Sequence, residues 1–161
     1  MDLLDRLLAH DAWTTNQLLI RCAELTDEQL DRVFAVDGRS VRALLAHLIG
    51  NVEVWTDLLI GRPVRRHESD SPGVSQLKAR HEAASAEFAD FARQIQSEGR
   101  LDDFWIDTLD EPPREKTCGG AVLHVLTHNM HHRAHLLLLL GWLGLKDLPE
   151  GDLLSWEAAN A

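Results

Sequence analysis

The sequence predicts an all-α protein, an antiparallel four-helix bundle formed by a single domain over residues 1–161. Apolar residues recur at helical spacing in four long segments, which glycine, proline or polar stretches separate. The chain has Gly 10 and Pro 5, which is few for a β-sandwich or barrel. With 45% hydrophobic residues, 161 residues are also enough to bury one core.

The first predicted helix spans residues 2–24, where leucines and Trp13 form the apolar set. Thr26 and Gln29 then have the spacing of a capping box, which predicts a short helical turn. The dipeptide Asp37–Gly38 marks a break before the next long segment.

The second predicted helix begins after Ser40, a typical N-cap residue, and ends at Gly61. Pro63 follows the glycine and cannot continue the helix. Residues 62–73 are predicted to be a polar loop.

The third predicted helix opens at Ser75 and runs over residues 76–98, with Gly99 as its stop. It is less apolar than the other three. Residues 101–118 form a long connection with room for a short hairpin. Four aspartates in this connection are expected to form a solvated acidic loop: Asp102, Asp103, Asp107 and Asp110.

The fourth predicted helix covers residues 120–144 and holds five of the nine histidines: His124, His128, His131, His132 and His135. At roughly 100° per residue, all of them except His131 fall within an arc of about 80° on one face. Imidazoles four residues apart can reach a single metal ion through their ring nitrogens. Two such ligands are too few for a site.

A third candidate ligand, His47, lies near the edge of the apolar stripe of the second helix, beside Asn51. A residue at the edge of a core face can point into the mouth of a bundle. Three imidazoles from two helices, with positions left for water or substrate, are typical of catalytic metal sites. The apolar stripe comprises Val41, Leu44, Leu45, Leu48, Val52, Trp55 and Leu59.

Charge and composition exclude several classes of function. The formal charge of −10 and the pI near 5.2 oppose contact with nucleic acid or anionic membrane, because phosphates would be repelled. The longest apolar run is shorter than the ~20 residues that a membrane span needs. Cys22 and Cys118 form no CxxC motif, and the amino terminus lacks a signal sequence, so we expect a cytoplasmic protein.

Several known motifs are absent. No glutamate has a histidine three residues later, which a di-iron carboxylate bundle needs. His128 is followed by Asn129, not by the glutamate of zinc proteases. Phosphate-binding glycine loops and the nucleophile elbow of esterases do not occur either.

Three stretches resemble the DinB-like family (DinB/YfiT-like metalloenzymes) in order and spacing: LLAHDAWTTNQLL, then SVRALLAHLIGNVEVW followed by LLIGRP, then LHVLTHNMHHRAHLLLLLGWLG. The resemblance implies a four-helix bundle, often dimeric, that holds one divalent metal. Carried over residue by residue, it implies the ligands His47, His128 and His132. The chain departs from many members at Arg133–Ala134–His135, where they have Arg-Gly-Gln, so His135 is a candidate for an added ligand or an outer hydrogen-bond donor. His124 and His131 are left out of the ligand set.

The resemblance also implies a class of chemistry, because some relatives are S-transferases or isomerases that use thiols such as mycothiol or bacillithiol. The expected function is therefore metal-dependent thiol S-transfer, with Arg133 or Arg42 as candidates to hold a thiol carboxylate. The rival is a non-catalytic metal-binding bundle with a role in stress response. Zinc and nickel are the leading ions, because imidazole suits both. Their binding is expected to weaken as the pH falls through about 6.5, the ordinary pKa of histidine.

A homodimer is expected on two grounds. The family resemblance implies it, and Leu136–Leu140 circle the whole helix, so part of the run should point away from the core.

Overall fold

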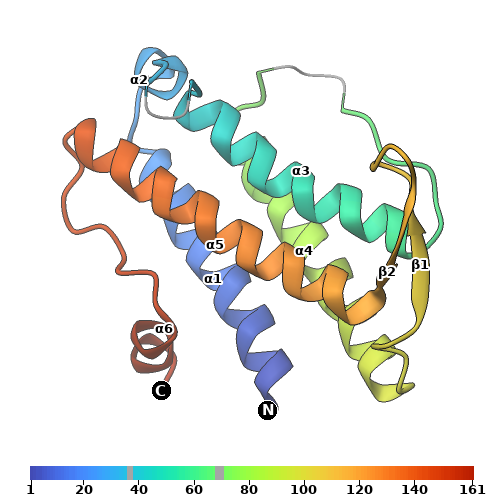
Figure 1. The fold of residues 1–161 in the computed structure, drawn as a ribbon. Helices are drawn as coiled ribbons and strands as arrows, with labels where there is room; N and C mark the ends of the chain where they lie inside the picture. Colours follow the sequence, from blue (N-terminus) through green and yellow to red (C-terminus); the bar gives the residue numbers. More distant parts are fainter. Residues whose placement is uncertain (36–37, 68–70) are drawn as a thin grey trace.

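The computed structural model describes residues 1–35, 38–67 and 71–161. Asp37, part of the predicted break, therefore lies outside the described residues. In the described part of the chain, the long elements are all helices and the only strands form one short hairpin, so the predicted all-α class is confirmed (Figure 1). In order, the elements are α1 (Leu3–Cys22), α2 (Asp27–Asp31), α3 (Val41–Leu59), α4 (Val74–Ser97), β1 (Phe104–Asp107), β2 (Arg114–Thr117), α5 (Cys118–Trp142) and α6 (Leu153–Ala159).

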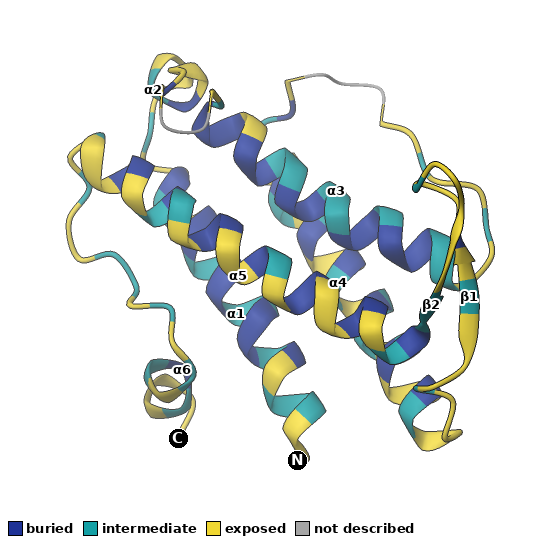
Figure 2. Cartoon of the chain, viewed as in Figure 1, coloured by how far each residue is buried: buried dark blue, intermediate teal, exposed yellow. Residues whose placement is uncertain are grey.

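The four long helices pack side by side. Helix α1 contacts α4 and α5, and α3 contacts the same two helices. Figure 2 shows buried residues along the sides where these helices meet and exposed residues on their outer sides. In the described part of the chain, no helix is long and apolar enough to cross a membrane.

Two apolar clusters hold the helices together. One includes Leu18 of α1, Leu44 of α3 and Leu139 of α5, and the other includes Val52 of α3 and Val125 of α5. On each of these three helices, buried or half-buried polar residues occupy the turn between the two clusters: buried Asp11, Thr14 and Thr15 on α1, half-buried Asn51 on α3, and buried Asn129 and Arg133 on α5.

The helix starts follow from their caps. Ser40 Oγ accepts from the Ala43 N–H at 3.2 Å, as its prediction as an N-cap requires. Helix α4 starts one residue before the predicted Ser75, because the Gly73 N–H donates to the Gln76 side chain at 2.9 Å. Helix α5 starts two residues earlier than predicted, because Thr117 Oγ1 accepts from the Gly120 N–H at 3.1 Å.

The leucine run at the end of α5 is largely accounted for within the chain. Leu136, Leu139 and Leu140 are fully buried, and Leu137 packs against the same cluster. Leu138 is 42% exposed. The run therefore gives little support to the prediction of a dimer.

The connection after α4 contains the short hairpin, with Phe104 opposite Thr117 in an antiparallel pair. The prediction of a solvated acidic loop is wrong for Asp107, which is 1% exposed. Its carboxylate accepts from Lys116 Nζ at 2.5 Å and from the Leu109 N–H at 2.9 Å. Burial raises the pKa of Asp107, but these hydrogen bonds outweigh it and leave the pKa below its usual range.

Helix α6 was not predicted from the sequence. Asp152 caps it by accepting from the Leu154 and Ser155 N–H groups at 2.8 Å and 3.0 Å. The segment lies against α1, where His10 Nε2 is 2.9 Å from the Gly151 carbonyl and Arg6 pairs with Glu157.

A buried carboxylate fixes the loop after α3. Asp57 is fully buried and accepts from Arg62 Nε at 2.5 Å and from Arg65 Nη2 at 2.5 Å. Arg62 and Arg65 also pair with Glu87 of α4, so the loop is tied to two helices.

We expect Asp57→Asn to lower the free energy of unfolding by about 2–3 kcal/mol, because charge-assisted hydrogen bonds to a buried group are lost. Glu87→Gln is the matched control, since Glu87 is 35% exposed and its removal should cost less than about 1 kcal/mol. Urea denaturation followed by circular dichroism measures both values. Equal losses for the two variants would contradict this account of the loop.

Candidate metal centre

Two helices carry the three predicted ligands. His47 lies on α3, next to fully buried leucines, and His128 and His132 lie one turn apart on α5. His132 is buried, and the other two are half-buried. Because helix backbones position all three side chains, their separation depends on how α3 packs on α5.

The three Nε2 atoms face one another. His47 Nε2 is 3.1 Å from His132 Nε2 and 3.4 Å from His128 Nε2, and the latter two atoms are 3.0 Å apart. A neutral imidazole carries its proton on one ring nitrogen and a lone pair on the other. If each ring carried its proton on Nδ1, three lone pairs would converge on one point, the arrangement that a divalent ion uses.

The donor set fits an ion of the zinc or nickel class. Among the described residues, the three imidazoles form the only group of three or more histidines, cysteines or carboxylates whose ligand atoms lie within 4.8 Å of one another. The group contains no carboxylate, and neutral nitrogen ligands suit zinc and nickel better than calcium or magnesium. Three ligands from the protein leave further coordination positions for water or substrate.

The surroundings favour the neutral form of His128 and His132. Burial is the main reason that the pKa of His132 falls to about 4, and the neighbouring His47 and His128 lower it further. Burial also lowers the pKa of His128, helped by the charges of His124 and His47. Neutral imidazole is the form that coordinates metals.

The other histidines of α5 do not converge with His47. His124 stacks on His128 with ring centroids 5.2 Å apart, and its ring centroid lies 4.7 Å from that of Trp55. His131 is exposed, and His135 is half-buried one turn after it. Helical spacing placed four histidines on one face, but only two of them reach the side chain on α3.

Sequence reasoning missed a buried polar network behind the three histidines. Asn51 Nδ2 donates to Asn129 Oδ1 at 3.3 Å, and Asn129 Nδ2 donates to Asp11 Oδ2 at 3.1 Å. Arg133 Nη1 pairs with Asp11 Oδ1 and lies 3.4 Å from Thr15 Oγ1. A signal was available, because Asn129 and Arg133 each directly follow a predicted ligand.

The structure does not support either arginine proposed to hold a thiol carboxylate. Arg133 is 3% exposed and is already paired with Asp11. Arg42 is 6% exposed and donates to Asp27 and Asp31 at 2.6 Å each. Arg39 is half-buried, and its charge contributes, after burial and neighbouring histidines, to the lowered pKa of His128 and His132. Arg39 is therefore a better candidate than Arg42 or Arg133 for contact with such a carboxylate.

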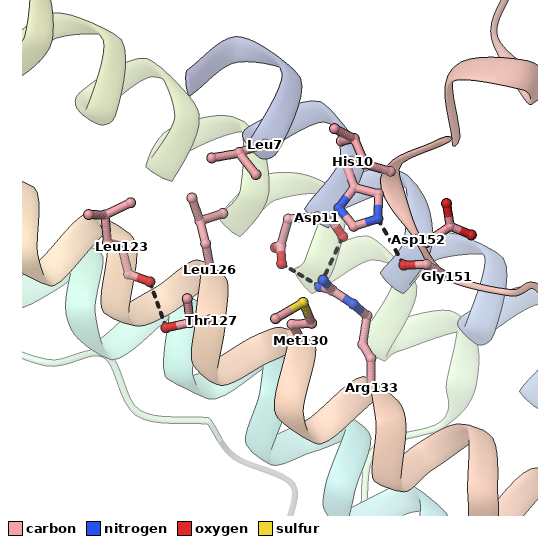
Figure 3. Close-up of a pocket in the computed structure, with 11 residues that line it drawn as sticks. Leu7, His10, Asp11, Leu123, Leu126, Thr127, Met130, Arg133, Gly151 and Asp152 are labelled. Carbon is pink, nitrogen blue, oxygen red and sulfur yellow. Dashed lines mark hydrogen bonds and ion pairs between the residues drawn. The ribbon is translucent and has the colours of Figure 1, made fainter. Parts of the chain in front are cut away.

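A cavity of about 270 Å³ lies between α1, α5 and the segment before α6 (Figure 3). It is lined by Leu7, Leu123 and Met130, with the Asp11–Arg133 pair at one side. Positions 123, 126 and 130 lie about 160–220° around α5 from position 128, so the cavity is on the far side of the helix from the three histidines.

The fold and the three convergent histidines define an α-helical protein with a candidate metal centre. The family model of the DinB family matches residues 1–157, and the chain belongs to that family. A DinB-like protein from Bacillus subtilis, known from its crystal structure, is similar with a TM-score of 0.69 and 18% identity, over 92% of this chain and 96% of that one. At this identity the likeness supports the fold alone. Comparison with curated proteins gives no match.

We expect the metal-free protein to lose stability as the pH falls from about 6.5 to about 4. An unfolded histidine has a pKa of about 6.5. Folded His132 takes up its proton only near pH 4, so acid favours the unfolded chain in this window and has no such effect above it. The contribution of this residue is on the order of 2 kcal/mol.

Urea denaturation at pH 7.5, 5.5 and 4.5 measures this effect as the difference between the wild type and His132→Asn. Exposed His131→Asn is the matched control and should behave as the wild type does. A pH dependence that His132→Asn leaves unchanged would contradict the prediction. By the same shift, protons should compete with a metal at His128 and His132 at a lower pH than the sequence-based value of about 6.5.

Proposed function

We propose that the chain binds one divalent ion, zinc or nickel, through His47, His128 and His132, and uses it for transfer chemistry with a low-molecular-weight thiol. The convergence of three Nε2 atoms within 3.0–3.4 Å of one another is the observation that carries this proposal. A bound ion with open positions would lower the pKa of a coordinated thiol and stabilise the thiolate as a nucleophile.

The residues of the chain have separate roles in this proposal. The three histidines hold the ion in their neutral form, and the Asp11–Arg133 and Asn51–Asn129 contacts fix the helices that carry them. His124 stacks on His128 and lies against Trp55, but it does not belong to the ligand set. Arg39 supplies positive charge for a carboxylate of the thiol.

We expect His132→Ala to lose the metal and thiol binding together while the helices stay folded. Removing one of three ligands from an open site leaves too few to retain the ion, and His132 belongs to neither apolar cluster. Elemental analysis after dialysis measures metal content, and circular dichroism measures helicity. His124→Ala is the matched control, because His124 stacks on His128 without reaching the other two rings.

The thiol part of the proposal needs a separate readout. In a cobalt-loaded sample, the visible spectrum should shift when mycothiol or bacillithiol enters the coordination sphere. His124→Ala should keep this response and His132→Ala should lose it. A loaded protein whose spectrum neither thiol changes would instead support a non-catalytic metal-binding protein, and full metal content in His132→Ala would refute the ligand set.

We also propose a homodimer in which a second copy covers an apolar face formed by α1 and α5. The face is defined by Leu3, Leu7, Leu123 and Met130, which are 80%, 38%, 54% and 56% exposed. Leu7 and Leu123 each line the cavity of Figure 3 and also a second cavity, of about 250 Å³, that Leu3 lines as well. Exposed apolar surface of this kind favours association with a partner.

Light scattering at micromolar concentration should give twice the chain mass of 18.1 kDa for the wild type. The double variant with Leu123→Glu and Met130→Glu should give the mass of one chain, because it places charges in the contact. Leu138→Glu, at another exposed leucine of α5, is the matched control and should remain dimeric. A monomeric wild type would exclude the dimer.

A further inference from the structure

We infer that His131 and His135 form a second site for a divalent cation, weaker than the three-histidine centre and next to it on α5. The inference does not depend on thiol chemistry. It rests on the arrangement of the two rings and on their access to solvent.

The two rings are arranged like a pair within the candidate centre. The ring centroids of His131 and His135 are 4.5 Å apart with the planes at 60°. Those of His128 and His132 are 4.4 Å apart with the planes at 76°. Both pairs are four residues apart on one helix, the spacing at which two imidazoles can bind a single ion.

The second pair occupies a neighbouring stripe of the helix. It is offset by three residues from the first pair, a rotation of about 60° around α5. His131 is exposed and His135 is half-buried, and Ala134 between them is small and exposed. Water can therefore reach an ion at this pair and complete its coordination, as in other open sites.

The neighbourhood of the first centre sets the order of affinity. The ring of His132 lies 5.4 Å from that of His131 and 6.2 Å from that of His135, so two bound cations would repel each other. Two protein ligands also hold an ion less firmly than three. The formal charge of −10 on the chain partly offsets this repulsion. The second cation should therefore bind about tenfold or more weakly than the first.

Isothermal titration with Ni²⁺ at pH 7.5 tests the inference, with equilibrium dialysis to count bound ions. The wild type should bind two equivalents of Ni²⁺, a tighter one and a weaker one. His131→Asn and, independently, His135→Asn should each retain the tighter equivalent and lose the weaker. His124→Asn, which changes another histidine of the same helix, is the matched control and should retain both.

His128→Asn separates this inference from the proposed function. It should lose the tighter equivalent while Ni²⁺ still binds at the second pair. If the wild type bound Ni²⁺ only weakly, and His131→Asn abolished that binding, the second site would stand and the three-histidine centre would fail. Saturation of the wild type at one tight equivalent, or a weaker equivalent that survives both His131→Asn and His135→Asn, would overturn the inference.

Discussion

The buried pair of Asp11 and Arg133 is the interaction on which the candidate centre depends most. It joins α1 to α5 at the residue next to His132, and Asp11 also accepts from Asn129, which in turn contacts Asn51 of α3. One carboxylate thus links the three helices directly behind the three histidines. A buried ion pair adds little net stability, but an incomplete one is costly, so it disfavours alternative packing of these helices. The two apolar clusters supply most of the folding stability, and the polar residues between them fix the register of the helices.

The centre differs in charge from metal sites built on carboxylates. Its three donors are imidazoles and none is a carboxylate, so a divalent ion bound by their neutral forms would keep its full charge for whatever occupies the open positions. The positive charge of Arg39 lies in the same neighbourhood. Both features favour an anionic ligand over a neutral one. The chain as a whole is strongly acidic, but the three histidines and Arg39 carry no negative charge.

The sequence was sufficient to predict those features that depend on neighbouring residues along the chain. Helical spacing predicted the four long helices, and Ser40 as the start of α3 was confirmed by its hydrogen bond to Ala43. His47 was predicted as a ligand because the surrounding sequence resembles a known family and because His47 lies at the edge of an apolar stripe. No local rule specifies that α3 brings His47 to within 3.4 Å of His128 and 3.1 Å of His132, because this distance depends on helix packing. Asp107 and Arg133 were misjudged for the same reason, since the partner of Asp107 is Lys116 on the neighbouring strand and the partner of Arg133 is Asp11 on another helix.

The division of the candidate ligands between two helices makes the centre sensitive to helix register. A shift of one helical turn would move His47 by about 5.4 Å relative to α5, more than the distances that separate the three nitrogens. An ion that binds all three would select the packed arrangement over any slipped one. Its affinity would then add to the folding free energy, by about 4.1 kcal/mol at a thousandfold excess over the dissociation constant. The availability of metal in the cell would in that way set how long the folded chain survives.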